Sequence, residues 1–103
     1  MTEYHKAIRD KIPEIIEKSG NKPNVKTLSD DEFLIELEKK LVEELNEYQE
    51  SKNVEELVDI MEVIYRIASL RGKSSEQLDE IRKGKSSERG ASEKNLFLLS
   101  TDD

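Results

Sequence analysis

The sequence contains no cysteine, so it forms neither disulfide bonds nor a thiolate metal site. It has one histidine and no tryptophan, and only 5% of its residues are aromatic. A chain so poor in histidine and cysteine is a poor match for zinc or copper. No apolar run approaches the roughly 18 residues of a membrane span, and the N-terminus lacks the apolar region of a signal peptide. We therefore expect a cytoplasmic protein that binds no membrane.

Hydrophobic residues are scarce as well, at 34% of the 103 residues, whereas 40% are charged. This length is typical of a single domain, so we interpret residues 1–103 as one all-α domain with a thin core. A thin core favours a helical hairpin completed by a second copy, giving a four-helix-bundle-like homodimer or a tetramer. The net charge of −7 disfavours nucleic acid as a partner. It does not disfavour a small anionic substrate held through a metal ion.

Apolar periodicity and capping residues predict four helices. The first covers residues 8–18, and Pro13 predicts that this segment either breaks or starts afresh there. The second begins at Ser29, which forms a capping box with Glu32, and ends near residues 50–52. The apolar stripe of this second helix consists of Leu34, Leu37, Leu41, Leu45 and Tyr48.

The third predicted helix follows Asn53 as its N-cap and stops before Gly72. Its apolar face consists of Leu57, Ile60, Met61, Ile64, Ile67 and Ala68. The short connection between the second and third helices predicts an antiparallel hairpin. The fourth helix begins at Ser74 and fades at residues 83–85. The apolar residues 96–99 then form either a short arm that packs on the domain or a disordered tail.

Two acidic pairs flank the hairpin connection. Glu44 and Glu47 are three residues apart on the second helix, so they share one face, and Glu56 and Asp59 repeat this spacing on the third. The hairpin brings the pairs to similar heights, where four converging carboxylates would repel one another without a counterion. Mg²⁺ suits such oxygen ligands, with Mn²⁺ as the alternative ion. The competing interpretation is that these acidic faces are only solvated.

The motifs also resemble those of a known family. The segment EELNE at 43–47, followed by ELVD at 56–59, resembles the EExxE…ExxD pattern of the all-α nucleoside triphosphate pyrophosphohydrolases. That superfamily includes the MazG proteins and phosphoribosyl-ATP pyrophosphohydrolase. The segment KAIRDKIP at 6–13 is similar to the K-L-V-R-D-K-I-P opening of the small phosphoribosyl-ATP pyrophosphohydrolase-like branch. Arg89-Gly90 fits the start of that branch's R-G-G-F, but Ala91-Ser92 replaces its second half.

The resemblance implies a Mg²⁺-dependent hydrolase that cleaves a nucleotide between its α- and β-phosphates, releasing a monophosphate and pyrophosphate. The metal ligands that it implies are Glu44, Glu47, Glu56 and Asp59. Glu43 or Glu47 would accept the proton of the attacking water. The implied contacts to the substrate's phosphates are Arg9, Lys11 and Arg89. Members of the family assemble as dimers or dimers of dimers.

The function that we expect first is the removal of noncanonical nucleoside triphosphates. Three alternative functions stay open. One is hydrolysis of phosphoribosyl-ATP. The second is nucleotide binding without turnover. The third is a non-catalytic interaction module whose leucine and isoleucine stripes bind a partner helix.

Overall fold

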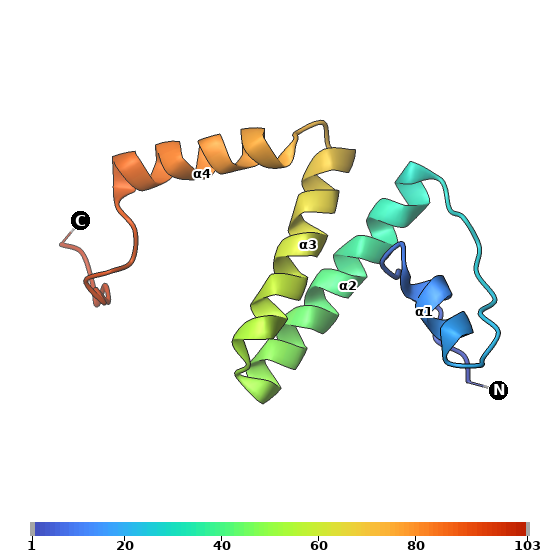
Figure 1. Cartoon of the computed structure of the whole chain (residues 1–103). Coiled ribbons are helices and arrows are strands. Elements are labelled where there is room, and N and C mark those ends of the chain that lie inside the picture. Colours follow the sequence, from blue (N-terminus) through green and yellow to red (C-terminus); the bar gives the residue numbers. More distant parts are fainter. Residues whose placement is uncertain (1, 103) are drawn as a thin grey trace.

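The fold is all-α. The computed structural model describes residues 2–102, and within that range it contains four helices and no strand (Figure 1). The helices are α1 (Ile12–Lys18), α2 (Asp30–Ser51), α3 (Val54–Leu70) and α4 (Ser75–Arg89). The long helices α2 and α3 form the predicted antiparallel hairpin (Figure 1). Among these helices, none combines the length and the apolar character that crossing a bilayer requires.

Capping residues fix where three of the helices begin, as the sequence predicts. The Ser29 hydroxyl accepts the backbone N–H of Glu32 at 3.2 Å, and the Glu32 carboxylate accepts the backbone N–H of Ser29 at 3.2 Å. Ser74 and Gln77 make the same reciprocal pair at the start of α4. The Asn53 side chain accepts a backbone N–H of the first turn of α3 at 3.0 Å. These caps satisfy backbone donors that have no partner inside the helix.

Left-handed residues end α2 and α3. Lys52, the C-cap of α2, has φ +59°, which lets the chain reverse within two residues. After α3, Gly72 has φ +90°, a conformation that favours glycine. The backbone N–H of Lys73 then reaches the carbonyl of Ala68 at 2.9 Å, and that of Gly72 reaches Ser69 at 3.0 Å. This is a Schellman motif, so Gly72 stops α3 as predicted.

The first helix is shorter than the predicted range 8–18, because it begins at Ile12. Pro13 occupies the first turn, where its missing N–H leaves no hydrogen bond unmade. Its ring would clash with the carbonyl four residues earlier in a longer helix. The start at residue 8 was therefore wrong, whereas a fresh start at Pro13, the alternative predicted for this segment, is confirmed. The residues before α1 are free to lie along the hairpin.

The last helix is longer than predicted. We expected it to fade at residues 83–85, but α4 continues through Gly84 and ends at Gly90, which has φ +83°. A glycine inside a helix costs only about 1 kcal/mol relative to alanine. That cost is too small to end a helix that begins with a capping box.

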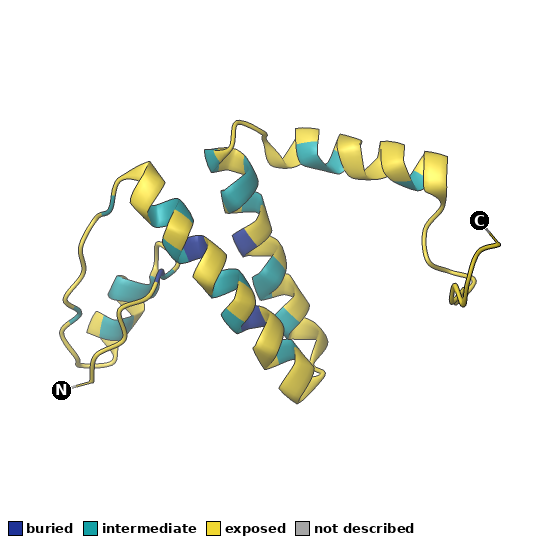
Figure 2. Cartoon of the chain, turned by 180° about the vertical axis from the view of Figure 1, so that it is seen from behind, coloured by how far each residue is buried: buried dark blue, intermediate teal, exposed yellow. Residues whose placement is uncertain are grey.

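The core is thin and lies between α2, α3 and the N-terminal segment (Figure 2). Its buried apolar residues are Ala7, Leu37 and Val63. Four partly buried residues pack against them: Phe33, Leu41, Ile67 and Leu70. Because Ala7 belongs to this core, the chain before α1 is anchored on the hairpin.

The structure confirms only part of the predicted apolar face of α3, because Ile67 packs against the core. The predicted apolar face includes Leu57, Met61 and Ile64, yet these are 40%, 47% and 38% exposed, whereas Val63 is 4% exposed. Since α3 is apolar on two opposite sides, periodicity does not determine which side meets α2. With Val63 facing α2, Glu56 and Asp59 turn toward the hairpin seam and become only partly exposed.

The C-terminal part of the chain, from α4 to residue 102, does not pack against the α2–α3 hairpin along its length. The helix α4 leaves the end of α3 and extends away from the hairpin (Figure 1). The apolar residues 96–99 do not pack on the domain and are 79–87% exposed. The radius of gyration is 18.0 Å, whereas a compact chain of this length has about 13 Å. A single copy therefore leaves much of its apolar surface uncovered.

Candidate metal centre

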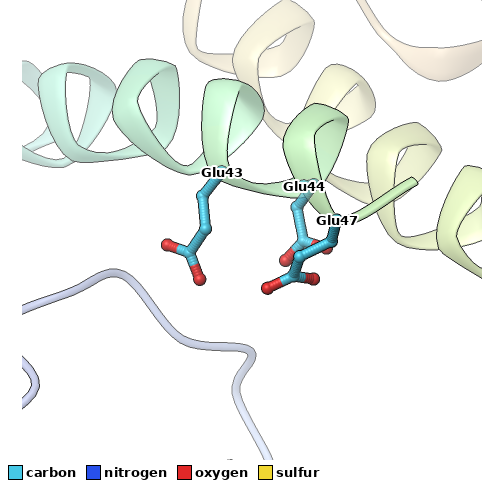
Figure 3. A group of neighbouring side chains, drawn as sticks. All are labelled: Glu43, Glu44 and Glu47. Carbon is cyan, nitrogen blue, oxygen red and sulfur yellow. The ribbon is translucent and has the colours of Figure 1, made fainter. Parts of the chain in front are cut away.

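Five carboxylates gather near the connected ends of α2 and α3, in two groups that share Glu44. Oxygen atoms of Glu44, Glu56 and Asp59 lie within 4.8 Å of one another. Oxygen atoms of Glu43, Glu44 and Glu47 form the second group within the same limit. Figure 3 shows the second group leaving α2 on one side, toward the N-terminal segment. We call these five residues the acidic cluster.

Glu44 is the centre of the acidic cluster and is buried. It is 7% exposed, because it follows the buried Leu37 by two helical turns and so faces α3. One carboxylate oxygen, Oε1, lies 3.4 Å from the ammonium of Lys40. The other, Oε2, is fully covered and has no hydrogen-bond partner among the described residues. A buried acceptor left unsatisfied is costly, and a cation bound at this position would satisfy it.

The electrostatics of Glu44 agree with this arrangement. Burial raises the pKa of Glu44, and the neighbouring charge of Glu47 raises it further, while Lys40 acts against both. Burial and the charge of Glu47 both make it costly to hold a carboxylate charge at this position. Adding a cation would remove that cost, so the ionised form of Glu44 and a bound metal ion stabilise each other.

Two cations from the N-terminal segment lie along the acidic cluster. The guanidinium of Arg9 is 3.7 Å from Asp59 and 3.9 Å from Glu62. The ammonium of Lys6 is 3.6 Å from Glu43. Ala7 lies between Lys6 and Arg9 in the sequence, and because it is buried it holds this segment against the hairpin. All these pairs are at least one-third exposed, so they contribute little stability and are easily exchanged for other partners.

The residues that we predicted for the site are only partly brought together. Glu44, Glu56 and Asp59 converge, whereas Glu47 stands with Glu43 on the outer side of Glu44. Arg9 lies at the acidic cluster. Lys11 is the exposed N-cap of α1 and has no ion pair within residues 2–102. Arg89 ends α4, on the helix that points away from the hairpin (Figure 1).

Sequence reasoning missed two cations at the acidic cluster, Lys6 and Lys40. The signal for Lys40 was present, because a lysine four residues before a glutamate lies on the same face of a helix. The contact of Lys6 with Glu43 joins distant parts of the chain and has no comparable signal in the sequence.

The acidic cluster offers only oxygen ligands, which suit a hard divalent cation. Ligand oxygens around Mg²⁺ lie about 2.0–2.1 Å from the ion, hence roughly 3–4 Å from one another. Three oxygens within 4.8 Å therefore need only small side-chain movements to surround one ion. Mg²⁺ keeps several waters, so the exposed side of the cluster leaves room for water and for substrate oxygens.

Similarity to known proteins is limited. No family model and no solved structure match the chain. An uncharacterized protein of Mycolicibacterium smegmatis is 52% identical over 40 residues. That match covers 39% of this chain and 41% of the other protein's length.

Proposed function

We propose that the chain is a Mg²⁺-dependent nucleotide pyrophosphohydrolase that cleaves between the α- and β-phosphates of a nucleoside triphosphate. The observation that best supports this is Glu44: a buried carboxylate with an unsatisfied oxygen, at the meeting point of two groups of acidic side chains. Nucleotide hydrolysis is a common use of Mg²⁺ held by carboxylates and substrate phosphates. The acidic motifs of α2 and α3 and their resemblance to the pyrophosphohydrolases supply the reaction type.

Glu44, Glu56 and Asp59 would hold the metal, with Glu47 completing the set from the outer side. A Mg²⁺ ion held by these residues would supply neutralisation of phosphate charge and activation of the attacking water. Water forms a bond to one phosphorus of the α–β bridge while the bond from that phosphorus to the bridging oxygen breaks. Glu43 or Glu47, both on the accessible side of the cluster, accepts the proton that the water loses.

Positive charge from the protein completes the site. Arg9 already lies against two carboxylates of α3, and its planar guanidinium matches phosphate oxygens. With Asp59 committed to a metal ion, the exposed Arg9 would be free to turn to the substrate. Lys11 and Arg89 would contribute only after the N-terminal segment and α4 move or when a second copy presents them.

We propose a homodimer, built on the apolar side of α3 that α2 leaves open. Leu57, Met61 and Ile64 lie roughly 140–160° from Asp59 around the helix axis, at about 100° per residue. Their 38–47% exposure leaves an apolar surface opposite the acidic cluster. Such a surface on a chain with few buried residues is typical of a protein–protein interface. A dimer formed there would leave the acidic edge open to substrate.

Release of pyrophosphate tests the proposed reaction. The protein is incubated with ordinary and modified nucleoside triphosphates and with phosphoribosyl-ATP, in Mg²⁺ or in chelator. We expect Mg²⁺-dependent release that Glu56→Gln abolishes. Glu55→Gln is the matched control, because Glu55 is exposed, is adjacent in sequence and does not belong to the acidic cluster. Equal release by the two variants would contradict the proposal.

The exposed side of α3 also favours a second function, a non-catalytic module that binds a partner helix. Such a module would tolerate Glu44→Gln and Glu56→Gln, and Mg²⁺ would not raise its melting temperature. Binding of Mg²⁺ and nucleotide without any product would instead indicate nucleotide binding without turnover.

A further inference from the structure

Lys40 forms the most buried ion pair of residues 2–102. Its side chain is 15% exposed and that of Glu44 is 9% exposed, whereas every other pair in this range has partners exposed by at least 29%. A buried ion pair is weak support for stability, because desolvation offsets much of the attraction. An apolar side chain would fill the same position without that cost, so the charge of Lys40 calls for another explanation.

The position of Lys40 is that of a counterion. Its ammonium contacts Oε1 of Glu44 at 3.4 Å and leaves Oε2 unpaired. The carboxylate is thus paired with one cation through Oε1, while its covered Oε2 has no partner among the described residues. Since an oxygen of Glu44 belongs to each group of the acidic cluster, any metal ion bound there lies within a few ångströms of the ammonium.

We infer that Lys40 is the resident counterion of the acidic cluster and a phosphate contact of the substrate. Without metal, its ammonium pairs with Oε1 of Glu44 and holds that carboxylate in position. When a divalent ion binds Glu44, the two cations repel each other, and the flexible ammonium turns to an oxygen of the metal-bound phosphate chain. This inference rests on the proposed function, because it takes a phosphate as the second partner of Lys40.

The two roles predict opposite effects for one substitution. Lys40→Met removes a positive charge beside the metal, so Mn²⁺ or Mg²⁺ alone should bind about tenfold more tightly. The same variant loses a charged contact to phosphate, so kcat/KM for the nucleotide should fall about tenfold or more. A substitution that merely damages the site would weaken both. Lys40→Gln provides a second variant in case the methionine disturbs folding.

Lys39→Met is the matched control. Lys39 is the neighbouring residue and also pairs with a glutamate, Glu36 at 3.2 Å, but its side chain is 69% exposed. We expect metal affinity and kcat/KM of this variant to match the wild type within twofold. Isothermal titration with Mn²⁺ in the absence of nucleotide measures the first effect and needs no turnover.

The outcomes are distinct. Tighter metal binding together with lower kcat/KM in Lys40→Met and Lys40→Gln, but not in Lys39→Met, supports the inference. Unchanged metal affinity, or weaker metal binding in both Lys40 variants, overturns it even if the wild type releases pyrophosphate. Tighter metal binding with unchanged kcat/KM overturns the phosphate contact. If the wild type binds no divalent ion, both the inference and the proposed metal site fail.

Discussion

Replacing Glu44 by glutamine tests metal binding without disturbing the fold. The side chain keeps its shape and its place between α2 and α3, but the carboxylate charge shared by both acidic groups is lost. If the acidic cluster binds Mg²⁺, this variant should fold as well as the wild type and respond much less to the metal. If the cluster is only a solvated surface, Mg²⁺ should affect neither protein.

The magnitude follows from the distances. Carboxylate oxygens of the cluster lie within 4.8 Å of one another. At that limit two unit charges repel each other by about 3 kcal/mol at an effective dielectric constant of about 20, and solvent on the outer sides of Glu43 and Glu47 reduces this to about 1 kcal/mol. Glu44→Gln relieves this repulsion but weakens the contact with Lys40. Because these changes oppose each other, the metal-free variant should melt within a few degrees of the wild type.

Mg²⁺ should raise the melting temperature of the wild type much more than that of Glu44→Gln. At about 100 times its dissociation constant, a ligand that binds only the folded state stabilises it by about 2.7 kcal/mol. For a domain of this size that raises the melting temperature by roughly 10–20 °C. Thermal unfolding followed by circular dichroism, with Mg²⁺ or with chelator, measures the shift. We expect Glu44→Gln to lose more than half of it and Glu55→Gln to retain it. An equal shift in all three proteins would refute the assignment of Glu44.

Four further variants test the fold and the proposed dimer. Leu37→Ala should cost about 2–5 kcal/mol in urea unfolding, because Leu37 is one of three buried apolar residues; a loss below 0.5 kcal/mol would contradict the proposed core. Ser29→Ala should cost about 1 kcal/mol by removing a cap. The backbone and side-chain hydrogen bonds of Ser29 lower the pKa of Glu32, so the stability that Glu32 contributes should be present above its unfolded pKa and lost as the pH falls through the lowered folded pKa. Ser29→Ala removes the hydroxyl but keeps the backbone N–H, so it should reduce that acid dependence in unfolding titrations without abolishing it. Gly72→Ala should cost about 1 kcal/mol or more, because φ is +90° there, and an unchanged melting temperature would argue against this turn. Met61→Glu should leave a monomer in analytical ultracentrifugation where the wild type sediments as a dimer.

The parts of the fold that depend on neighbouring residues could be predicted from the sequence. Ser29, Asn53 and Ser74 cap helices through contacts within three residues, so their patterns are sufficient. Gly72 likewise acts through its own backbone angle. Pro13 predicted either a break or a fresh start in the first segment, but the apolar spacing from Ile8 could not decide between them, and α1 begins at Ile12 with Pro13 in its first turn.

The parts that depend on packing could not be predicted in the same way. Helix α3 is apolar on two sides, and only contact with α2 shows that Val63 faces inward while Met61 faces outward. The acidic pairs were found by their spacing, but the spacing did not show that Glu44 alone is buried and central. It also gave no reason to place Glu47 apart from Glu56 and Asp59.

The measurement that tests the proposed activity most directly is phosphorus NMR of a nucleoside triphosphate during incubation with the protein and Mg²⁺. The substrate is the one that the pyrophosphate assay identifies. We predict that the nucleoside monophosphate and pyrophosphate appear together in equal amounts, and that neither forms with chelator or with Glu56→Gln. Orthophosphate as the first product, or a reaction that persists without a divalent ion, would contradict hydrolysis of the α–β bridge at the acidic cluster.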